Sequence, residues 1–343
     1  MGSNNTSILL TGASGFAGAH MLKFLLENTD SFIYCPVTYE HGGHRNRISS
    51  LVNAEFNNRF ELFELDLAKD SLSGSFDDRN LRLIINFASE SHVDRSITDP
   101  VHFVSNNVNL MTNILEFTRN HINRVQLIHI STDEVYGAID DESENVEWNK
   151  PYLPSNPYSA SKAAQESLSI AYSKTFGLDL TIVNVTNMIG ESQNQEKFIP
   201  KVIRKINDGE VINVDTDPRG IVGSRKYVYV GDVAEAIYLI YTKMVKDKNR
   251  MNSLPNKFHI SGEKDFTNLQ IVNLIAGFLN REAITQVSES PRPGYDLKYV
   301  LSSEKIRSLG WKNIESLEQR LSQIVAWTLN NDEWMQNDHS NAK

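Results

Sequence analysis

The sequence predicts an α/β fold: a doubly wound parallel sheet followed by a smaller C-terminal α/β domain. Three observations lead to this prediction. Short, continuously apolar runs alternate with longer helical patterns through the first half of the chain, as in a parallel sheet that helices cover on both faces. A glycine-rich turn joins the first apolar run to the first helical pattern. After about residue 187 the alternation becomes less regular, which indicates a second unit.

Six apolar segments of the first half are the predicted strands of the sheet. They cover residues 7–11, 32–37, 59–66, 82–88, 125–131 and 178–185. Between them, apolar residues recur every three or four positions, as expected of helices. The first helical pattern runs through Gly18, Met21, Leu22 and Leu25, and two further helices are predicted over 108–120 and 159–176. This alternation is typical of a Rossmann-type fold.

The second half carries the elements of the smaller domain. Helices are predicted over 199–208, 230–245 and 267–280, strands over 225–230 and 256–261, and two closing segments over 299–311 and 316–331. We predict a first domain formed by residues 1–186 with parts of 225–260. The remaining parts of 187–330 form the second domain, and the polar residues 331–343 form a frayed tail.

The composition is that of a soluble globular protein, and it limits the possible partners. Of the 343 residues, 40% are apolar and 22% are charged, and the formal net charge is −9. This acidic balance disfavours nucleic acid or an acidic membrane as a partner. No apolar run reaches about 18 residues, so no transmembrane helix is expected. The single cysteine, Cys35, excludes an intramolecular disulfide, and with no secretion signal at the N-terminus a cytoplasmic location is expected.

The turn "TGASGFAG" has the spacing of a nucleotide-binding loop. Gly12 permits a tight turn, Gly15 lets the backbone approach a pyrophosphate, and Gly18 lets the helix pack closely on the sheet. The helix that follows would direct its unpaired N–H groups and positive dipole end at the phosphates. Because the loop follows the first strand of an α/β alternation, a dinucleotide is a better expectation than an empty turn.

The end of the second strand leaves the choice of dinucleotide open. An acid is expected there if the adenosine ribose hydroxyl of NAD is to be bound, but Cys35 and Pro36 occupy the place and Glu40 lies further on. His44, Arg45 and Arg47 follow, and could either meet the 2′-phosphate of NADP or form a solvated basic loop. Asp66 follows the third strand, where a side chain can reach an adenine amine.

Tyr158 and Lys162 in "YSASK" are spaced four residues apart on one predicted helix, so they share a face. A neighbouring ammonium favours a phenolate, so Lys162 is expected to lower the pKa of Tyr158. Tyr158 could then take a proton from a substrate hydroxyl while a hydride leaves the same carbon. The alternative is a surface pair without function. No metal is expected, because the nine histidines include no zinc-binding helical motif.

Two adjacent acids, Asp133 and Glu134 in "STDEVYG", directly follow the fifth predicted strand. Like charges repel, and a strand end is partly desolvated, so the pair is unfavourable unless it has a use. Either these residues cap the following turn, or they act as an acid and a base.

Taken together, these motifs resemble the nucleotide-sugar 4,6-dehydratases of the extended short-chain dehydrogenase/reductase family. The stretches that carry the resemblance are "TGASGFAG", "NFASESHVDRSI", "STDEVYG", "PSNPYSASKAA", "NQEKFIPKVI", "KYVYVGD" and "RPGYDLKYVLSSEKIRSLGW". They cover nearly the whole chain in the order of the family. The resemblance implies a cytoplasmic enzyme that converts an NDP-hexose to an NDP-4-keto-6-deoxyhexose with a tightly bound, internally recycled NAD(P).

The resemblance also implies roles for individual residues. Tyr158 and Thr132 would bind the oxygen at C4, Glu134 would remove the proton at C5, and Asp133 would protonate the leaving hydroxyl at C6. The cofactor would contact the three loop glycines, Tyr158 and Lys162, and in addition Phe16, Arg45, Asp66, Leu67 and Ala88. The nucleotide sugar would contact Glu90, Ser91, Asn187, Arg225 and Arg292, with His92 nearby. Thr38 and Tyr39 keep the register of NAD-dependent relatives, which favours NAD over NADP.

Three departures from the family limit these expectations. The acid of the second strand is missing, Asn184 stands where the family has an arginine, and Ile189 replaces a tyrosine. The stretch "SGEKDFTN" also lacks the asparagine that the family places near the nucleotide base. The base and the sugar are therefore left open, among dTDP, UDP, GDP and CDP and among hexoses and N-acetylhexosamines.

Two other functions stay open beside the dehydratase. A nucleotide-sugar 4-epimerase of the same fold is disfavoured by Asp133 and Glu134, because epimerases usually have neutral residues there. A non-catalytic cofactor-binding protein is disfavoured by the full set of catalytic residues. In the resembled family, helices equivalent to 108–120 and 159–176 pair as a four-helix bundle, so a homodimer is expected.

Overall fold

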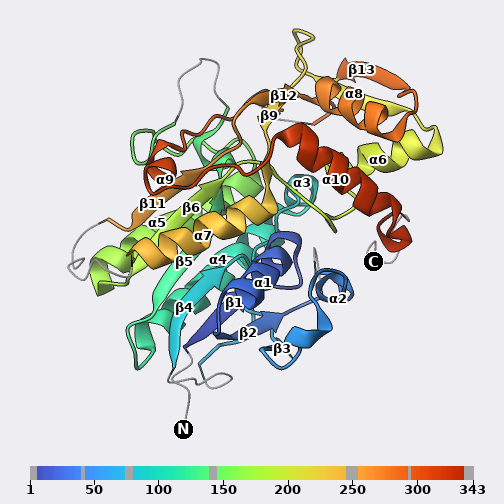
Figure 1. Ribbon diagram of the computed structural model, residues 1–343. Helices are drawn as coiled ribbons and strands as arrows, with labels where there is room; N and C mark the ends of the chain where they lie inside the picture. The colour runs from blue at the N-terminus through green and yellow to red at the C-terminus, as the bar shows by residue number, and fades with distance from the viewer. Residues whose placement is uncertain are drawn as a thin grey trace.

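A seven-stranded parallel sheet forms the centre of the protein (Figure 1). The structure is a computed structural model that describes residues 6–39, 43–73, 80–138, 145–244, 254–292 and 295–335. The strand order is β11-β6-β5-β4-β1-β2-β3. The strands are β1 Ser7–Thr11, β2 Phe32–Val37, β3 Phe60–Glu64, β4 Leu81–Asn86, β5 Gln126–Thr132, β6 Leu180–Val185 and β11 Asn256–Ile260.

Helices cover both faces of this sheet, as the apolar strands require. The helices α1 Phe16–Asn28, α2 Arg47–Leu51 and α7 Val230–Met244 lie on one face, where Ile8 and Leu10 of β1 join the larger apolar core. The helices α4 Pro100–Asn120 and α5 Pro157–Phe176 lie on the other face, where Leu9 belongs to a second core. The predicted doubly wound α/β fold is confirmed.

The order of strands reverses at β1, because β2 pairs with one edge of β1 and β4 with the other. The chain leaves β1 and β4 in opposite directions at this point, and the loops after the two strands separate. Ligands of open α/β sheets bind in the crevice outside the carboxyl ends of the strands at such a switch point. The glycine loop follows β1, and the segment with Ala88 follows β4.

The C-terminal elements form a smaller unit that lies beyond the carboxyl ends of the strands in Figure 1. Its helices are α6 Phe198–Asp208, α8 Asn268–Leu279 and α10 Leu317–Leu329, which share a third core. Its short strands pair as β8 Ile212–Thr216 with β13 Thr285–Glu289, β9 Ser224–Lys226 with β12 Asp265–Thr267, and β7 Met188–Ile189 with β10 Val228–Tyr229. The strand expected over 225–230 is thus divided into β9 and β10, and α7 begins at Val230.

The remaining elements are short. They are α3 Val93–Thr98, α9 Glu304–Ser308 and the 3-10 helices η1 Ala54–Phe56, η2 Asp133–Tyr136 and η3 Asp332–Trp334. Because α7 and β11 return to the large sheet, a boundary near residue 186 describes only part of the chain's path, and the division into two domains stays our proposal. Among the described residues, no helix is long and apolar enough to span a bilayer.

The segment before the C-terminus packs more closely than a frayed tail would. Trp334 in η3 is only 5% exposed, its ring lies 4.7 Å from that of His44, and the Arg47 guanidinium lies 5.1 Å from its centre. Asn46 Nδ2 donates a 2.7 Å hydrogen bond to the Glu333 carboxylate. Residues 331–335 therefore differ from the expected tail, because an aromatic anchor holds them. Residues 336–343 lie outside the described residues.

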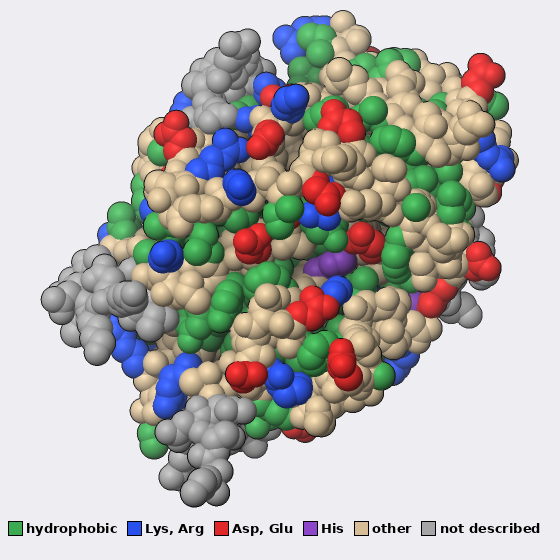
Figure 2. Space-filling model, in the orientation of Figure 1, with side chains coloured by type: hydrophobic (Ala, Val, Ile, Leu, Met, Phe, Trp, Pro, Cys, Tyr) green, Lys and Arg blue, Asp and Glu red, His purple; other side chains and the backbone are tan. Residues whose placement is uncertain are grey.

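Charges on the surface are mixed in sign. On the face drawn in Figure 2, lysine and arginine side chains lie among aspartate and glutamate side chains, without a continuous field of one sign.

Candidate active site

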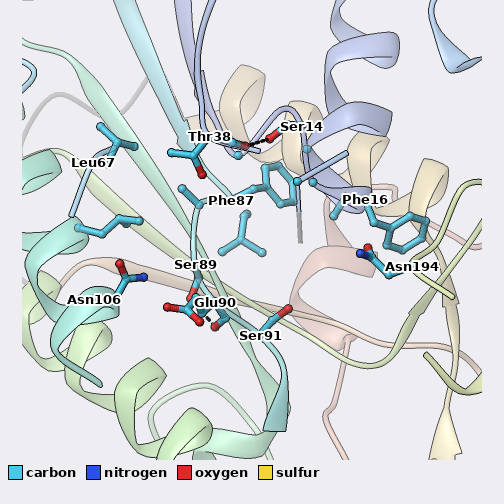
Figure 3. A pocket seen from close by; sticks show the side chains of 18 of the residues that line it. Ser14, Phe16, Thr38, Leu67, Phe87, Ser89, Glu90, Ser91, Asn106 and Asn194 are labelled. Atoms are coloured by element: carbon cyan, nitrogen blue, oxygen red, sulfur yellow. Dashed lines mark hydrogen bonds between the residues drawn. The ribbon is translucent and has the colours of Figure 1, made fainter. Parts of the chain in front are cut away.

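A cleft opens at the switch point of the sheet, between the glycine loop, the ends of β2 and β4, and α5 (Figure 3). Most of the residues predicted to bind the cofactor line this cleft, as do two of those predicted to bind the sugar. The predicted residues in its wall are Gly12, Gly15, Phe16, Gly18, Asp66, Leu67, Ala88, Glu90, Ser91, Tyr158 and Lys162. The fold therefore brings together residues from four separate parts of the sequence.

The glycine loop forms a backbone cradle in which side chains have no room. Gly12 has a φ of 75°, and a Cβ atom there would lie 2.8 Å from the backbone nitrogen of Ala88. A Cβ atom on Gly18 would lie 2.1 Å from the carbonyl oxygen of Gly12. The helix α1 begins directly after the loop at Phe16, so its N–H groups and positive dipole end face the cleft. This arrangement fits a dinucleotide pyrophosphate.

Arg47 in the basic loop after β2 is buried within the protein, whereas the sequence suggested either a solvated side chain or a contact with a 2′-phosphate. Arg47 is fully buried, and its guanidinium donates to the carbonyl oxygens of Ser14 (2.6 Å) and Ser192 (3.0 Å) and to Asn194 Oδ1 (3.0 Å). The Arg47 side chain therefore connects the glycine loop to the segment at Ser192 and Asn194. This corrects the prediction that Arg47 could meet a 2′-phosphate. Arg45 is exposed and lies 4.1 Å from the centre of the Tyr39 ring.

Two other residues discussed for the adenosine end, Thr38 and Asp66, line the cleft. Thr38, at the end of β2, lines the cleft, and its carbonyl oxygen accepts a 2.8 Å hydrogen bond from Ser14 Oγ (Figure 3). Asp66 also lines the cleft, and its carboxylate caps the backbone N–H of Ala68 and pairs with Lys69. Glu40 lies outside the described residues.

Tyr158 is placed by the first turn of α5. Asn156 caps the helix in a capping box with Ser159, Pro157 takes the first helical position, and Ser96 Oγ accepts a 3.1 Å hydrogen bond from the backbone N–H of Tyr158. Burial and the charges of Glu134 and Asp133 raise the pKa of Tyr158, although a hydrogen bond with Thr132 opposes that rise.

Lys162 lies one turn after Tyr158 on α5 and reaches the backbone of β5. Its ammonium donates to the carbonyl oxygen of Ile130 and to Gln165 Oε1, both at 2.8 Å. Burial lowers the pKa of Lys162 to about 7, against a raising effect of Glu166. The Lys162 ammonium is therefore held against β5, and the expectation that it lowers the Tyr158 pKa stays a prediction.

The two acids form the 3-10 helix η2 at the end of β5. Thr132 is its N-cap: its hydroxyl accepts from the Glu134 backbone N–H (3.3 Å) and donates to Asp133 Oδ1 (3.0 Å). Burial and the neighbouring Glu134 charge raise the pKa of Asp133 to about 7. Burial also raises the pKa of Glu134, whose carboxylate accepts a 3.3 Å hydrogen bond from Asn156. At neutral pH the pair can hold one acid and one base.

The remaining predicted sugar contacts lie further from the cleft wall. Arg225 lies over the Tyr299 ring and donates to the carbonyl oxygens of Ser224, Asp296 and Leu297. Its charge opposes the rise in the pKa values of Asp133 and Glu134. Arg292 pairs at 2.7 Å with Asp94. Asn187 is exposed, and its carbonyl oxygen accepts from the Val228 N–H. His92 caps α3.

Lys197 is a charged cleft residue that the motif analysis missed. It precedes α6 and donates a 3.2 Å hydrogen bond from Nζ to the carbonyl oxygen of Ser91. Burial lowers its pKa, whereas the charges of Glu196 and Glu134 raise it. The stretch "NQEKFIP" offered the signal, because a lysine directly before an apolar helix start is an unusual position for a solvated side chain.

Comparisons with known proteins agree with this geometry. The family model described as the NAD dependent epimerase/dehydratase family matches residues 8–253. The chain is similar to dTDP-glucose 4,6-dehydratase 1 of Escherichia coli K12, with 32% identity over 98% of this chain and 96% of that protein. Among solved structures it is similar to the dTDP-glucose 4,6-dehydratase of Streptomyces venezuelae with NAD bound, with 29% identity, a TM-score of 0.83, and coverage of 96% of this chain and 98% of that one. The UDP-glucose 4-epimerase of Thermus thermophilus shares the fold at 24% identity and a TM-score of 0.80, covering 95% of this chain and all of that one.

The match extends over well more than half of the chain and includes the glycine loop, the acidic helix η2 and the Tyr158–Lys162 helix. The chain belongs to the NAD-dependent epimerase/dehydratase family.

Proposed function

We propose that this protein is a nucleotide-sugar 4,6-dehydratase, which converts an NDP-hexose to an NDP-4-keto-6-deoxyhexose. The observation that carries the proposal is the pair Asp133–Glu134 on η2, one member of which is protonated near neutral pH. Simple oxidation and re-reduction at C4 needs neither acid. Elimination of water across C5 and C6 needs both a base and an acid, and the names of the similar proteins point the same way.

The cleft fits NAD as the cofactor. The backbone cradle at Gly12 and Gly18 suits the pyrophosphate, and Arg47 is turned into the protein rather than toward a 2′-phosphate. Similar dehydratases were solved with NAD. When bound, NAD would take the hydride from C4 of the sugar and give it back to C6, so that it is regenerated in every cycle.

The first step belongs to Tyr158, Thr132 and Lys162. Tyr158 takes the proton of the C4 hydroxyl as the C4–H bond breaks, and the Thr132 hydroxyl supports the oxygen that becomes a ketone. The raised pKa of Tyr158 means that its phenolate must be favoured by positive charge in the complete complex. Lys162 would be one source of such charge, and the oxidised cofactor, when bound, would be another.

The second step belongs to the acid pair. The C4 ketone acidifies the C5 hydrogen, and the Glu134 carboxylate removes that proton. Asp133 donates its proton to the departing C6 hydroxyl, so water leaves and a C5–C6 double bond remains. After hydride returns to C6, Glu134 gives the proton back to C5 and Tyr158 gives up the proton it took, while Asp133 regains one from solvent.

The nucleotide diphosphate needs cations outside the cofactor cradle. Lys197 at the cleft wall, with Arg225 and Arg292 beyond it, supplies three positive groups on the side of the C-terminal unit. We assign Glu90, Ser91 and Asn187 to the sugar side of the same path. These assignments do not distinguish dTDP from UDP, GDP or CDP.

We also propose a cytoplasmic homodimer that forms through a four-helix bundle. The helices α4 and α5 pack against each other on one face of the sheet. Apolar side chains on their outer surface are exposed, with Val101 at 77% and Phe176 at 46%. An isologous contact between two copies of this surface would bury them.

The test is a panel of NDP-hexoses and NDP-N-acetylhexosamines incubated with the purified protein, followed by mass spectrometry of the products. The proposal expects loss of one water from at least one nucleotide sugar without added reductant or oxidant. A product of unchanged mass with inverted C4 would instead indicate a 4-epimerase. Turnover that consumes one added cofactor per product would contradict the internal return of the hydride.

A further inference from the structure

A buried ion pair lies directly behind the active-site end of β5. The Glu166 carboxylate on α5 and the Lys257 ammonium on β11 are 2.7 Å apart, and their side chains are 0% and 1% exposed. The mechanism above uses neither residue. Taking two charges out of water is costly, and a buried pair is weak evidence for stability, so its role has to be sought in what it contacts.

The Glu166 carboxylate is held by four hydrogen bonds. Its Oε1 accepts from Ser131 Oγ at 2.5 Å and from Asn184 Nδ2 at 2.7 Å. Its Oε2 accepts from the Tyr152 hydroxyl and from Lys257 Nζ, both at 2.7 Å. Two acceptor sites on each oxygen are thus used, which fixes the position of the carboxylate.

Two of these partners connect Glu166 to the catalytic Thr132. Ser131 directly precedes Thr132 on β5. The Asn184 amide, besides contacting Glu166, donates a 2.8 Å hydrogen bond to the backbone carbonyl oxygen of Thr132. The strand end that presents the Thr132 hydroxyl is therefore tied to the buried carboxylate from two sides.

A third connection leads from Glu166 to Lys162. Tyr158, Lys162 and Glu166 follow one another at intervals of four residues on α5, so they share one face of the helix. Burial lowers the pKa of Lys162, and the negative charge of Glu166 acts against this effect.

The Lys257 end of the pair contacts the acidic helix η2. Its ammonium lies 4.9, 4.7 and 4.9 Å from the ring centres of Tyr136, Trp148 and Tyr152. Tyr136 is the last residue of η2, three positions after Asp133. A cation enclosed by three aromatic faces is strongly held, so it restrains the ring at the end of the catalytic helix.

We propose that Glu166 and Lys257 are positioning residues that hold Thr132 and η2 in register, and that the Glu166 carboxylate supplies the negative charge on the face of α5 that carries Tyr158 and Lys162. The inference rests on the proposed function, because it assigns the pair to the same reaction. Among the described residues, the pair is surrounded by several titratable groups. They are Lys162 on α5, His129 on β5, Tyr136 on η2, Glu147 and Tyr152 on the following segment, His259 on β11, and Lys305 on α9, which donates to the carbonyl oxygen of Lys257.

The experiment compares Glu166→Gln, Glu166→Asp and the double variant Glu166→Gln/Lys257→Met with the wild-type enzyme. Three quantities are measured as functions of pH: the rate of cofactor reduction in a single turnover, the affinity of cofactor-depleted protein for NAD, and the melting temperature. Arg320→Met is the matched control, because Arg320 pairs at 3.4 Å with another buried carboxylate, Asp232, away from the cleft.

Loss of the Glu166 charge should let Lys162 lose its proton at lower pH. In Glu166→Gln the alkaline limbs of the reduction rate and of NAD affinity should both move to lower pH, and the rate at pH 8 should fall about tenfold, the effect of roughly one pKa unit. Glu166→Asp keeps a carboxylate, so both pH profiles should return toward those of the wild type. The double variant removes both charges, so it should melt close to the wild-type temperature and still show the shifted limbs.

Several results would overturn the proposal. One is a double variant whose reduction rate and NAD affinity depend on pH as in the wild type. The others are a shifted pH dependence in Arg320→Met and a pH dependence in Glu166→Asp that stays as shifted as in Glu166→Gln. The NAD-affinity arm separates this proposal from the proposed function, since it needs no sugar. A protein that dehydrates no nucleotide sugar but whose NAD affinity shifts as expected would refute the function and retain the link between Glu166 and Lys162.

Discussion

Replacing Asp133 by asparagine should remove dehydration and at the same time stabilise the fold above neutral pH. The pKa of Asp133 rises from 3.8 to about 7, first because of burial and second because of Glu134. A carboxyl with the ordinary pKa would be protonated in fewer than about one molecule in a thousand at pH 7, whereas about half of the Asp133 side chains carry the proton. The proposed general acid would thus carry its proton in a sizeable share of molecules near neutral pH.

The same shift sets the direction of the stability effect. Between the unfolded pKa near 4 and the folded pKa near 7, the folded state binds more protons than the unfolded state, so stability falls as pH rises through this window. With about 1.4 kcal/mol for each unit, the ionised Asp133 costs the folded state on the order of 4 kcal/mol above pH 7. Asparagine carries no charge and can still accept the Thr132 hydrogen bond.

The assay measures both consequences in the same variant. Melting temperatures of wild type and Asp133→Asn should differ little below pH 4 and increasingly in favour of the variant up to pH 8. Dehydration should fall by about 10²–10⁴-fold, the usual contribution of general acid catalysis. Reduced cofactor should accumulate, because oxidation at C4 needs Tyr158 rather than Asp133. Equal melting temperatures at pH 8, or dehydration near the wild-type rate, would refute this account of Asp133.

Three further predictions follow from the site and the surface. Tyr158→Phe should abolish cofactor reduction while NAD still binds, because the variant keeps the ring against Phe103 but loses the hydroxyl that accepts the proton. Reduction is measured by absorbance, and an unchanged rate would contradict the role of the hydroxyl. Purified protein should carry bound cofactor, and mass spectrometry of the nucleotide released by denaturation should give NAD; a mass with one more phosphate would mean that Arg45 suffices to select NADP. Ala171→Arg on the exposed surface of α5 should convert the dimer to a monomer, as measured by light scattering. The control variant Ser322→Arg, on the exposed surface of α10, should leave the dimer intact. A monomeric wild-type protein at micromolar concentration would exclude the dimer.

The parallel sheet and the cleft were predictable from the sequence because local patterns encode them. An apolar run without alternation implies a strand buried on both faces, and a glycine triplet after the first such strand implies a backbone cradle. The order of the elements then places the loop after β1, the segment after β4 and the N-terminus of α5 at the same edge. Both Gly12 and Tyr158 could be located in this way.

The partners of buried cations were not predictable, because they come from distant segments. Arg47 looked like a solvated or phosphate-binding residue in a basic loop, yet it binds a carbonyl group of the loop at Ser192, which has a φ of 58°. Lys257 gave no signal at all, since its carboxylate and aromatic partners lie more than 90 positions earlier in the chain. Spacing along the sequence reports only on partners within one element.

Helix α5 illustrates why both kinds of information are needed. An ordinary surface helix directs its apolar stripe at the core, but most of the side chains that α5 buries are polar. They are Ser159, Ser161, Lys162, Gln165, Glu166, Ser169 and Ser173, together with Ala163. Glu166 contacts Ser131 and Asn184 at the ends of β5 and β6, whereas Asn107 of α4 donates to the Ser161 hydroxyl and accepts through its carbonyl oxygen from Gln165.

This polar inner face has a consequence for the outer face of the same helix. Apolar residues lie on this outer face: Ala164 is partly exposed, and Ala171 and Phe176 are exposed. A helix that buries charge on one side and exposes apolar surface on the other gains little from burial within one chain. Covering the outer face with a second copy would supply the missing apolar burial. The catalytic arrangement and the proposed dimer are therefore linked, because the residues that α5 commits to the active site determine which residues remain for assembly.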